Sequence, residues 1–285
     1  MTGLKIGGVP EHFNLPWRLS IEERLFNSIG LELHWSDMTG GTGQMIKGLQ
    51  TGSIDIAVLL TEGITKSILE GLDAKIVNIY VQTPLRWGVH VPVDSKFTSL
   101  SDLENGTFAI SRFGSGSHLM ALVHANQAGW DTSKLKFNVV GDVYGGLWAL
   151  ENCEADAFLW EKFTTKPFVD KGKCRCIGEV VTPWPCFVIA VRTKILEQHS
   201  ELITEMCKIA GERANELKNK DESIQTFSWR YHLEPSDVKL WLSETNWNYT
   251  MDFTKDSFEN TISVLNQLKL IEPDALTNWK NVLFS

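Results

Sequence analysis

Strand-like apolar runs alternate with helical patterns from residue 4 to residue 180, and this alternation limits the folds open to the chain. Strands that alternate with helices form a mostly parallel sheet with helices on its faces, so we expect an α/β fold. Ligands of such sheets bind at the carboxyl ends of the strands, so the turns that follow the strands are the candidate site. The runs predict strands at 4–9, 31–36, 54–60, 75–81, 107–111, 135–140, 155–160 and 175–180.

Two extended segments, 82–94 and 186–193, interrupt this alternation. We expect each to be a crossing strand at a hinge between two Rossmann-like lobes. The first lobe is then discontinuous, residues 1–86 and 189–285, and the second lobe is 87–188. Helical spacing dominates after the second crossing, and these helices are expected to pack on the first lobe as a C-terminal tail. They are predicted at 197–218, 221–232, 235–245, 254–268 and 272–283.

A short internal similarity favours two related lobes. Leu49–Asp55 and Leu150–Asp156 each read as a helix end, a turn, and an acid that opens a strand. Each of these strands is followed by an acid, Glu62 in the first case and Glu161 in the second.

The turn between the strand at 107–111 and the next helix is the strongest binding candidate. Free backbone N–H groups and the helix dipole at such a position favour an anionic or strongly polar group. An arginine there can make a bidentate contact to a carboxylate, sulfonate or phosphate. The alternatives are a serine-capped turn and a surface ion pair of Arg112. The candidate residues are Ser111, Arg112, Gly114, Ser115, Gly116, Ser117 and His118.

Further candidates follow the other strands or lie in the crossing segments. The segment 10–17 is expected to be an irregular loop because of its prolines, and its ring-bearing side chains are expected to border the site. The competing explanations are turn chemistry for the glycines, helix capping for the acids, and packing for the tryptophans. The candidates are His12, Asn14, Trp17, Gly40, Gly41, Thr42, Thr61, Glu62, Gln82, Pro84, Asp142, Tyr144, Glu161 and Trp184, with Arg86 and Trp87 also at the first crossing.

Composition argues against several classes of protein. The net charge is −8 and no basic run occurs, so no nucleic-acid partner is expected. No apolar run is long enough for membrane insertion. Five cysteines, an odd number, indicate free thiols, and Cys174-x-Cys176 lacks a second pair at zinc-ligand spacing. No catalytic motif, metal site or cofactor motif is recognised, so a non-enzyme is expected. The start of the chain lacks a leader pattern, which predicts a cytoplasmic protein, or a periplasmic one if a leader was removed.

Taken together, these features resemble type II periplasmic binding proteins. The resemblance rests on the two lobes, the two crossings, GGTGQMIKGLQTGSIDIAVLLTEG at 40–63 and SRFGSGSHLMA at 111–121. The most similar groups are the nitrate, sulfonate and taurine binding components of ABC importers and the thiamine-pyrimidine-precursor proteins.

The resemblance implies capture of a small polar or anionic metabolite between the lobes by hinge closure, sensed by a transporter or signalling partner. One alternative is a pyrimidine-precursor enzyme with bound pyridoxal phosphate, although the CCCFC-type motif of the eukaryotic enzymes is absent. Another is a cytosolic regulatory module that keeps the fold without a ligand.

Overall fold

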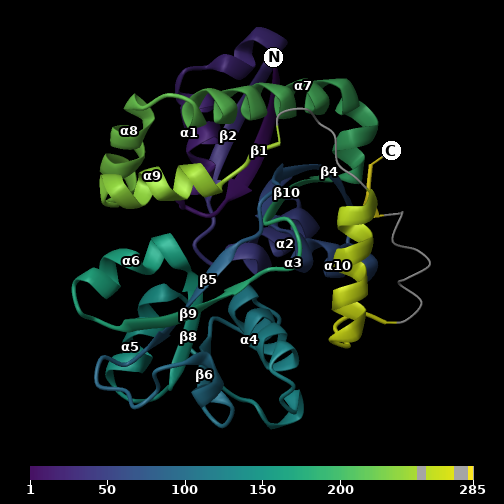
Figure 1. Ribbon diagram of the computed structural model, residues 1–285. Coiled ribbons are helices and arrows are strands. Elements are labelled where there is room, and N and C mark those ends of the chain that lie inside the picture. Colours follow the sequence, from purple (N-terminus) through teal and green to yellow (C-terminus); the bar gives the residue numbers. More distant parts are fainter. Residues whose placement is uncertain (249–254, 273–281, 285) are drawn as a thin grey trace. The chain divides into compact units, whose positions relative to one another are not determined.

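The structure is a computed structural model, described for residues 1–248, 255–272 and 282–284. The chain divides into two compact units (Figure 1): unit 1 is Met1–Pro84 with Pro183–Ser285, and unit 2 is Leu85–Thr182. The sequence predicts that the chain returns to the first lobe between residues 188 and 189. Here the return falls at 182/183, because the strand β10 (Phe187–Arg192) pairs with strands of unit 1.

Unit 1 is built on a five-stranded sheet in the order β2-β1-β3-β10-β4. Strands β1, β2 and β3 are parallel, and β10 is antiparallel to both of its neighbours. Helix α1 packs with the C-terminal helix α7, whereas α2 and α3 pack together. The elements are β1 (Thr2–Gly8), α1 (Leu15–Glu22), β2 (Leu31–Asp37), α2 (Gly41–Thr51), β3 (Ile56–Leu60), α3 (Thr61–Leu69) and β4 (Ala74–Val81).

Unit 2 repeats this plan with the order β7-β6-β8-β5-β9. Strands β6, β7 and β8 are parallel, and β5 is the antiparallel strand. Figure 1 shows α4 on one side of this sheet and α5 and α6 on the other. The elements are β5 (Arg86–Val91), β6 (Thr107–Ile110), α4 (Gly116–Gln127), β7 (Lys136–Val139), α5 (Val143–Glu151), β8 (Ala157–Glu161), α6 (Lys162–Asp170) and β9 (Arg175–Val181).

The internal similarity of the sequence has a structural counterpart. Asp55 Oδ2 accepts a hydrogen bond from the amide of Lys5 at 3.0 Å, and Asp156 Oδ2 accepts one from the amide of Thr107 at 2.8 Å. Each acid therefore ties the start of its own strand to the neighbouring parallel strand. Because Ile56 and Ala157 follow these acids directly, Leu60 occupies the position of Glu161 in this repeat, and Glu62 the position of Phe163.

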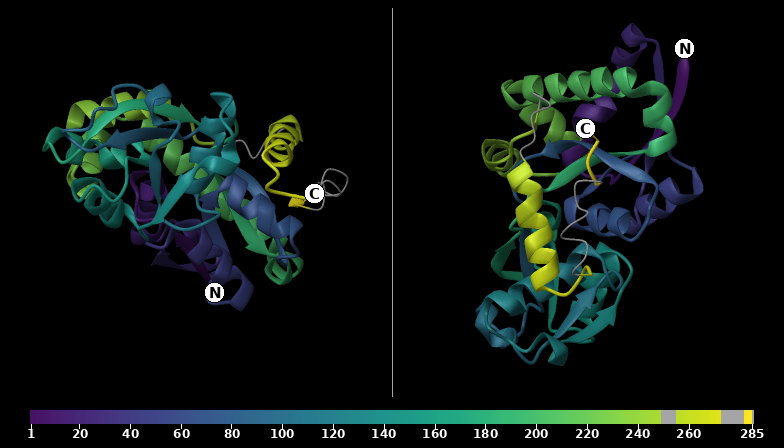
Figure 2. Two further views of the ribbon diagram at one scale, coloured as in Figure 1. Left: turned by 90° about the horizontal axis from the view of Figure 1, so that it is seen from below. Right: turned by 90° about the vertical axis from the view of Figure 1, so that its right-hand side faces the viewer.

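The C-terminal helices pack on unit 1, as expected. Helix α7 (Thr193–Lys218) contacts α1, β4 and β10, and it bends at His199, where φ is −143° (Figure 2). It is followed by α8 (Glu222–Tyr231), α9 (Pro235–Glu244) and α10 (Lys255–Gln267), which packs on α3. The helix predicted at 272–283 lies almost wholly outside the described residues. The α/β fold and the packing of the tail are confirmed.

One local prediction, the loop at 10–17, is wrong, and the position of a proline explains the difference. The segment 10–17 is not an irregular loop, because a 3-10 turn (His12–Asn14) leads straight into α1. Pro16 stands in the first turn of α1, where its missing N–H leaves no hydrogen bond unmade. A second proline, Pro167, lies inside α6, which continues through it to Asp170.

The capping-box pattern at Ser20–Glu23 and the glycine at position 30 predict a helix between them, but no continuous helix spans these residues. Helix α1 ends at Glu22, and Arg24 takes a left-handed conformation with φ of 59°. A separate 3-10 turn, Leu25–Ile29, then leads to Gly30. The remaining 3-10 turns are Leu100–Leu103 and Thr132–Lys134.

Candidate functional site

In each unit, the carboxyl ends of the parallel strands and the first turns of the following helices share one edge of the sheet. We call this the carboxyl edge of the unit. It carries the starts of α1, α2 and α3 in unit 1 and of α4, α5 and α6 in unit 2. The predicted site residues divide between the units. Unit 1 holds those of the segments 10–17, 40–42 and 61–62, and unit 2 holds those of 111–118, 142–144 and 161.

The side chains of the first segment are buried inside unit 1. The ring of His12 lies 4.3 Å from that of Trp241 and 4.7 Å from that of Phe13. Burial lowers the pKa of His12 to about 3. Trp17 is fully buried against Phe26 and Tyr80, with ring centroids 5.9 and 5.8 Å away. Packing with the sheet and with the C-terminal helices therefore accounts for these side chains.

Asn14 also serves the local structure. Its Nδ2 donates to the carbonyl of Val9 at 2.9 Å, so the side chain closes the turn after β1.

Gly40, Gly41 and Thr42 form the start of α2. Gly40 is the N-cap residue and gives the helix no side-chain cap, while its amide donates to Oε1 of Gln44 at 2.8 Å. Gly41 has φ of 64°, and its amide donates to the carbonyl of Met38 at 2.9 Å. Thr42 is buried against Gly63 of α3. A Cβ added to Gly63 would lie 2.6 Å from Cγ2 of Thr42.

Thr61 and Glu62 hold the segment that enters β10. The hydroxyl of Thr61 donates to the carbonyl of Pro185 at 2.6 Å. The indole Nε1 of Trp184 donates to Oε2 of Glu62 at 2.9 Å. Glu62 is 1% exposed, and its Oε1 has no hydrogen-bond partner among the described residues. Burial raises the pKa of Glu62 to about 7. Glu62 and Trp184 are thus brought together, which their separation in sequence did not predict.

Gln82 and Pro84 lie at the end of the first chain segment of unit 1, Met1–Pro84. Both are exposed, and the amide of Gln82 donates to the carbonyl of Asn246 at 2.8 Å.

The serine-rich turn of unit 2 is held by its own side chains. Ser117 Oγ accepts from the amide of Ser111 at 3.0 Å, and the hydroxyls of Ser115 and Ser117 lie 3.1 Å apart. Ser115 caps α4 by accepting from the amide of His118. Both Ser115 and Ser117 are buried. The hydroxyls therefore serve the turn itself, which is the capped-turn alternative.

Four further residues of this turn, Arg112, Gly114, Gly116 and His118, are exposed or only partly buried. The amide of Gly114 donates to Nδ1 of His118 at 3.0 Å, and the ring of His118 lies 4.7 Å from that of Phe137. Arg112 is half-buried, and burial lowers the pKa of both Arg112 and His118. Gly116 is the first residue of α4.

The other unit 2 candidates also cap helices. Asp142 Oδ1 accepts from the amide of Gly145 at 2.9 Å at the start of α5. Glu161 caps α6 through the amides of Phe163 and Thr164, at 3.1 and 2.6 Å, and through the hydroxyl of Thr164 at 2.8 Å. Burial raises the pKa of Glu161 to about 7 in spite of these donors. Tyr144, by contrast, is 69% exposed.

An ion-paired group at the carboxyl edge of unit 2 was missed. Arg86 Nε lies 2.7 Å from Glu179 Oε2, and Lys162 Nζ lies 2.5 Å from Glu179 Oε1. Arg86 was expected at the crossing, but its partners were not. The pairing of β5 with β9, which sets Gly88 opposite Glu179, brings the three together. Alternation of strands and helices does not predict such antiparallel pairing.

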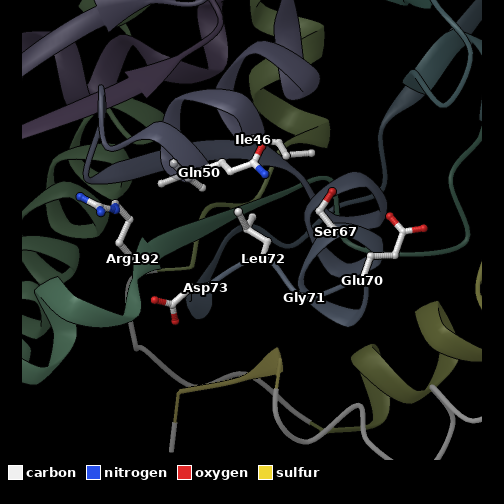
Figure 3. Close-up of a pocket in the computed structure, with 9 residues that line it drawn as sticks. Ile46, Gln50, Ser67, Glu70, Gly71, Leu72, Asp73 and Arg192 are labelled. Atoms are coloured by element: carbon white, nitrogen blue, oxygen red, sulfur yellow. The ribbon is translucent and has the colours of Figure 1, made fainter.

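A separate pocket of about 400 Å³ lies at the opposite edge of the unit 1 sheet. Figure 3 shows Arg192 and Asp73 on one side of it, and Ser67 of α3 and Glu70, the residue that follows α3, on the other. Because β3 and β4 begin at this edge, it is not the edge where ligands of such sheets bind. In the described part of the chain, no group of three His, Cys, Asp or Glu side chains is placed to hold a metal ion. Likewise, none of the described helices has the length and apolar character needed to cross a membrane.

Comparison with known proteins agrees with this architecture. Residues 87–180, nearly all of unit 2, match the sequence model of a family described as Ca3427-like PBP. A comparison with curated protein sequences gave no match.

Three solved structures illustrate the likeness in fold. The CA3427 gene product of Candida albicans, described as defining a new family with the generic periplasmic binding protein fold, has a TM-score of 0.91 at 24% identity, covering 99% of this chain and 95% of that one. The alkanesulfonate-binding protein SsuA of Xanthomonas axonopodis pv. citri, bound to MOPS, has a TM-score of 0.84 at 15% identity, covering 100% and 98%. The nitrate-binding protein NrtA of Synechocystis PCC 6803 has a TM-score of 0.66 at 13% identity, covering 99% and 88%.

The chain therefore has the periplasmic-binding-protein fold. The resemblance to sulfonate and nitrate binding proteins, expected from the sequence, is confirmed at the level of fold. These named neighbours are ligand-binding proteins.

Proposed function

We propose that this protein captures a small polar or anionic metabolite by closure of its two units about a hinge. The proposal is carried by a fold shared with proteins named for the sulfonate or nitrate that they bind. The repeated carboxyl edge gives further support, because ligands of such sheets bind where helices begin after the strands.

The alternative, a pyrimidine-precursor enzyme that holds pyridoxal phosphate, is less well supported. Such chemistry needs a lysine whose amine is uncharged and can attack a carbonyl. Lys162 lies at the carboxyl edge of unit 2, but its ammonium group forms an ion pair with Glu179. We therefore retain the binding function.

A thermal-shift screen tests the proposal. Purified protein is heated with sulfonates, carboxylates, phosphates, nitrate and uncharged pyrimidines at one ionic strength. A ligand at about one hundred times its dissociation constant stabilises the folded state by about 2.7 kcal/mol, so the melting temperature must rise and depend on ligand concentration.

Native mass spectrometry of the same preparation identifies any small molecule that copurifies. A protein that carries no copurified molecule and whose melting temperature responds to none of the compounds would contradict the proposal.

A further inference from the structure

The chain passes from unit 2 back to unit 1 through residues 182–186, which lead into β10. We call these residues the return segment. At one end, the amide of Leu85 donates to Oγ1 of Thr182 at 2.9 Å. At the other end, the amide of Cys186 donates to the carbonyl of Thr83 at 3.2 Å. The return segment is therefore bonded to the stretch of chain that leaves unit 1.

The first turn of α3 holds the middle of the return segment to unit 1. The hydroxyl of Thr61 donates to the carbonyl of Pro185 at 2.6 Å, and its amide donates to the carbonyl of Cys186 at 3.2 Å. The indole Nε1 of Trp184 donates to Oε2 of Glu62 at 2.9 Å, and both side chains are buried. One of the bonds that attach the return segment to α3 thus depends on an ionisable group.

The carboxyl group of Glu62 lacks the contacts that a buried carboxylate needs. Among the described residues, Oε1 has no hydrogen-bond partner. A buried carboxylate requires a paired charge or several hydrogen-bond donors. The N–H of Trp184 and the amide of Glu62 itself favour the ionised form, but burial disfavours it more strongly and raises the pKa to about 7. The attached arrangement therefore favours neutral Glu62.

No ionic partner stabilises the charged form of Glu62 in the described part of the chain, because the shift in its pKa has no contribution from another charge. The elements that pack on α3 are α2, β3, β4, β10 and α10. Lys66, one turn further along α3, pairs with Glu70 and donates to the carbonyl of Leu270. Across these elements, α3 and the return segment, the other titratable side chains that the structure describes are Lys47, Lys66, Lys75, Tyr80, Cys186, Arg192 and Glu259.

We propose that Glu62 and Trp184 form a proton-controlled anchor, in which neutral Glu62 holds the return segment on α3 and ionised Glu62 favours its release. Release is a local opening in which Trp184 leaves Glu62 and water reaches the carboxylate. The pKa of Glu62 is about 7 when the segment is attached, against the ordinary 4.5 in water. Linkage then predicts that the equilibrium constant for opening rises about tenfold between pH 6 and pH 8. The inference goes beyond the proposed function, since the opening involves no ligand.

A purely structural role for the pair gives a different expectation. In that case the return segment leaves α3 only when unit 1 unfolds as a whole. Cys186, which is buried in the return segment, and Cys207, which is buried in α7, would then become accessible together. In the anchor role, Cys186 becomes accessible while Cys207 stays protected.

The experiment labels the cysteines of the purified protein with iodoacetamide, without added ligand, and follows each one by mass spectrometry of its peptide. Cys153 is exposed and gives the rate of the chemical step at each pH. The labelling rate of Cys186 divided by that of Cys153 is therefore proportional to the equilibrium constant for opening. We expect this ratio to rise about tenfold between pH 6 and pH 8, and Cys207 to react much more slowly than Cys186 at both values.

Three variants assign the opening to the anchor. Glu62→Gln keeps an acceptor for Trp184 and cannot ionise, so the ratio should change by less than about twofold between pH 6 and pH 8. Glu70→Gln is the matched control, because Glu70 follows the other end of α3 and is exposed, and it should keep the wild-type rise. Trp184→Phe keeps a ring but removes the N–H, so Cys186 should react faster than in the wild type at both pH values.

Equal labelling of Cys186 and Cys207 in the wild type would overturn the inference, as would a rise with pH that Glu62→Gln leaves unchanged. Slow labelling of Cys207 also shows that a variant is folded. If Glu62→Gln does not fold, a wild-type ratio that stays level between pH 6 and pH 8 still overturns the inference, and a tenfold rise that Glu70→Gln retains supports it. A ligand screen without a hit contradicts the proposed function and leaves the anchor standing, because labelling is measured without ligand.

Discussion

The two units share one strand order, yet they treat the starts of their helices differently. In unit 1, none of α1, α2 and α3 has a side-chain cap. In unit 2, each of α4, α5 and α6 has one, supplied by Ser115, Asp142 and Glu161. These three side chains at the carboxyl edge of unit 2 therefore serve their own backbone, as capping residues do.

The difference also separates two buried carboxyl groups that look alike in sequence. Glu161 accepts three hydrogen bonds at the cap of α6. Glu62 lies two positions further along the repeat, where unit 2 has Phe163, and it accepts the indole N–H of Trp184. Burial of an acid at a position that the other unit fills with an apolar ring points to a role beyond packing.

Replacing Glu161 should have the largest effect. Glu161→Ala leaves the buried amides of Phe163 and Thr164 without their acceptor. We expect the free energy of unfolding to fall by about 2 to 4 kcal/mol, the combined effect of a lost cap and of unsatisfied buried groups. Urea denaturation measures this loss. Glu62→Gln, which keeps the acceptor for Trp184, is the control and should cost clearly less. Equal losses would remove the distinction between the two acids.

The pH dependence of stability tests whether Glu62 is a buried acid of raised pKa. Its folded-state pKa is about 7 against an ordinary value of 4.5. The folded state therefore holds an extra proton between these values, so this contribution to stability is present below pH 4.5 and is lost as the pH rises through 7. The wild type should lose up to about 3 kcal/mol more than Glu62→Gln between pH 5 and pH 8.

Urea titrations at several pH values measure this difference, and the comparison with Glu62→Gln removes the opposite effect of the buried histidines. Burial lowers the pKa of His12 to about 3 and of His90 to about 4. Their contributions are present above pH 6.5 and are lost as the pH falls through those values. Parallel pH profiles for wild type and variant would show that Glu62 is not a raised-pKa acid.

The turns of the internal repeat offer a smaller test. Gly52 and Cys153 hold the same position and both take positive φ, 74° and 56°. At Gly52 an added Cβ would lie 2.9 Å from Nη1 of Arg192. Gly52→Ala should therefore destabilise the protein by about 1 to 2 kcal/mol.

Cys153→Gly should have the opposite sign and stabilise the protein by up to about 1 kcal/mol, since it relieves left-handed strain at an exposed residue. Thermal unfolding of both variants measures the two changes in stability and their signs. A destabilised Cys153→Gly would show that its side chain makes a contact worth more than the strain.

The fold was predictable from the sequence because it depends on local patterns. Each strand predicted from the alternating pattern appears within about two residues of its expected ends, since apolar runs and turn residues mark them directly, whereas the crossing segment 82–94 holds the shorter strand β5. The relation between Leu49–Asp55 and Leu150–Asp156 was also visible, because the same acid performs the same task in both units.

The site was less predictable because its contacts join distant parts of the chain. Trp184 and Glu62 are 122 positions apart, and the burial of His12 depends on Trp241 in α9. Serines and acids in turns gave the same pattern whether they were free to bind a ligand or capped a helix. In unit 2 the structure favours capping for Ser115, Asp142 and Glu161, and a hydrogen bond within the turn for Ser117. Whether any candidate contacts a ligand stays a prediction.

The smallest effect is expected where the two units differ by a single cap. Asp142 caps α5 through the amide of Gly145, whereas Gly40 begins α2 without a side chain. Asp142→Ala should lower the free energy of unfolding by about 1 kcal/mol, the usual value of an N-cap. Gly40→Ala should lower it by less, about 0.5 kcal/mol, because φ is negative there but alanine is less favourable than glycine at an N-cap, and the added Cβ would lie 3.1 Å from the Cβ of Gln44. Urea denaturation measures both losses. A larger loss for Gly40→Ala than for Asp142→Ala would contradict the contrast between the units, since α2, which has no side-chain cap, would then depend more on its N-cap residue than α5 does.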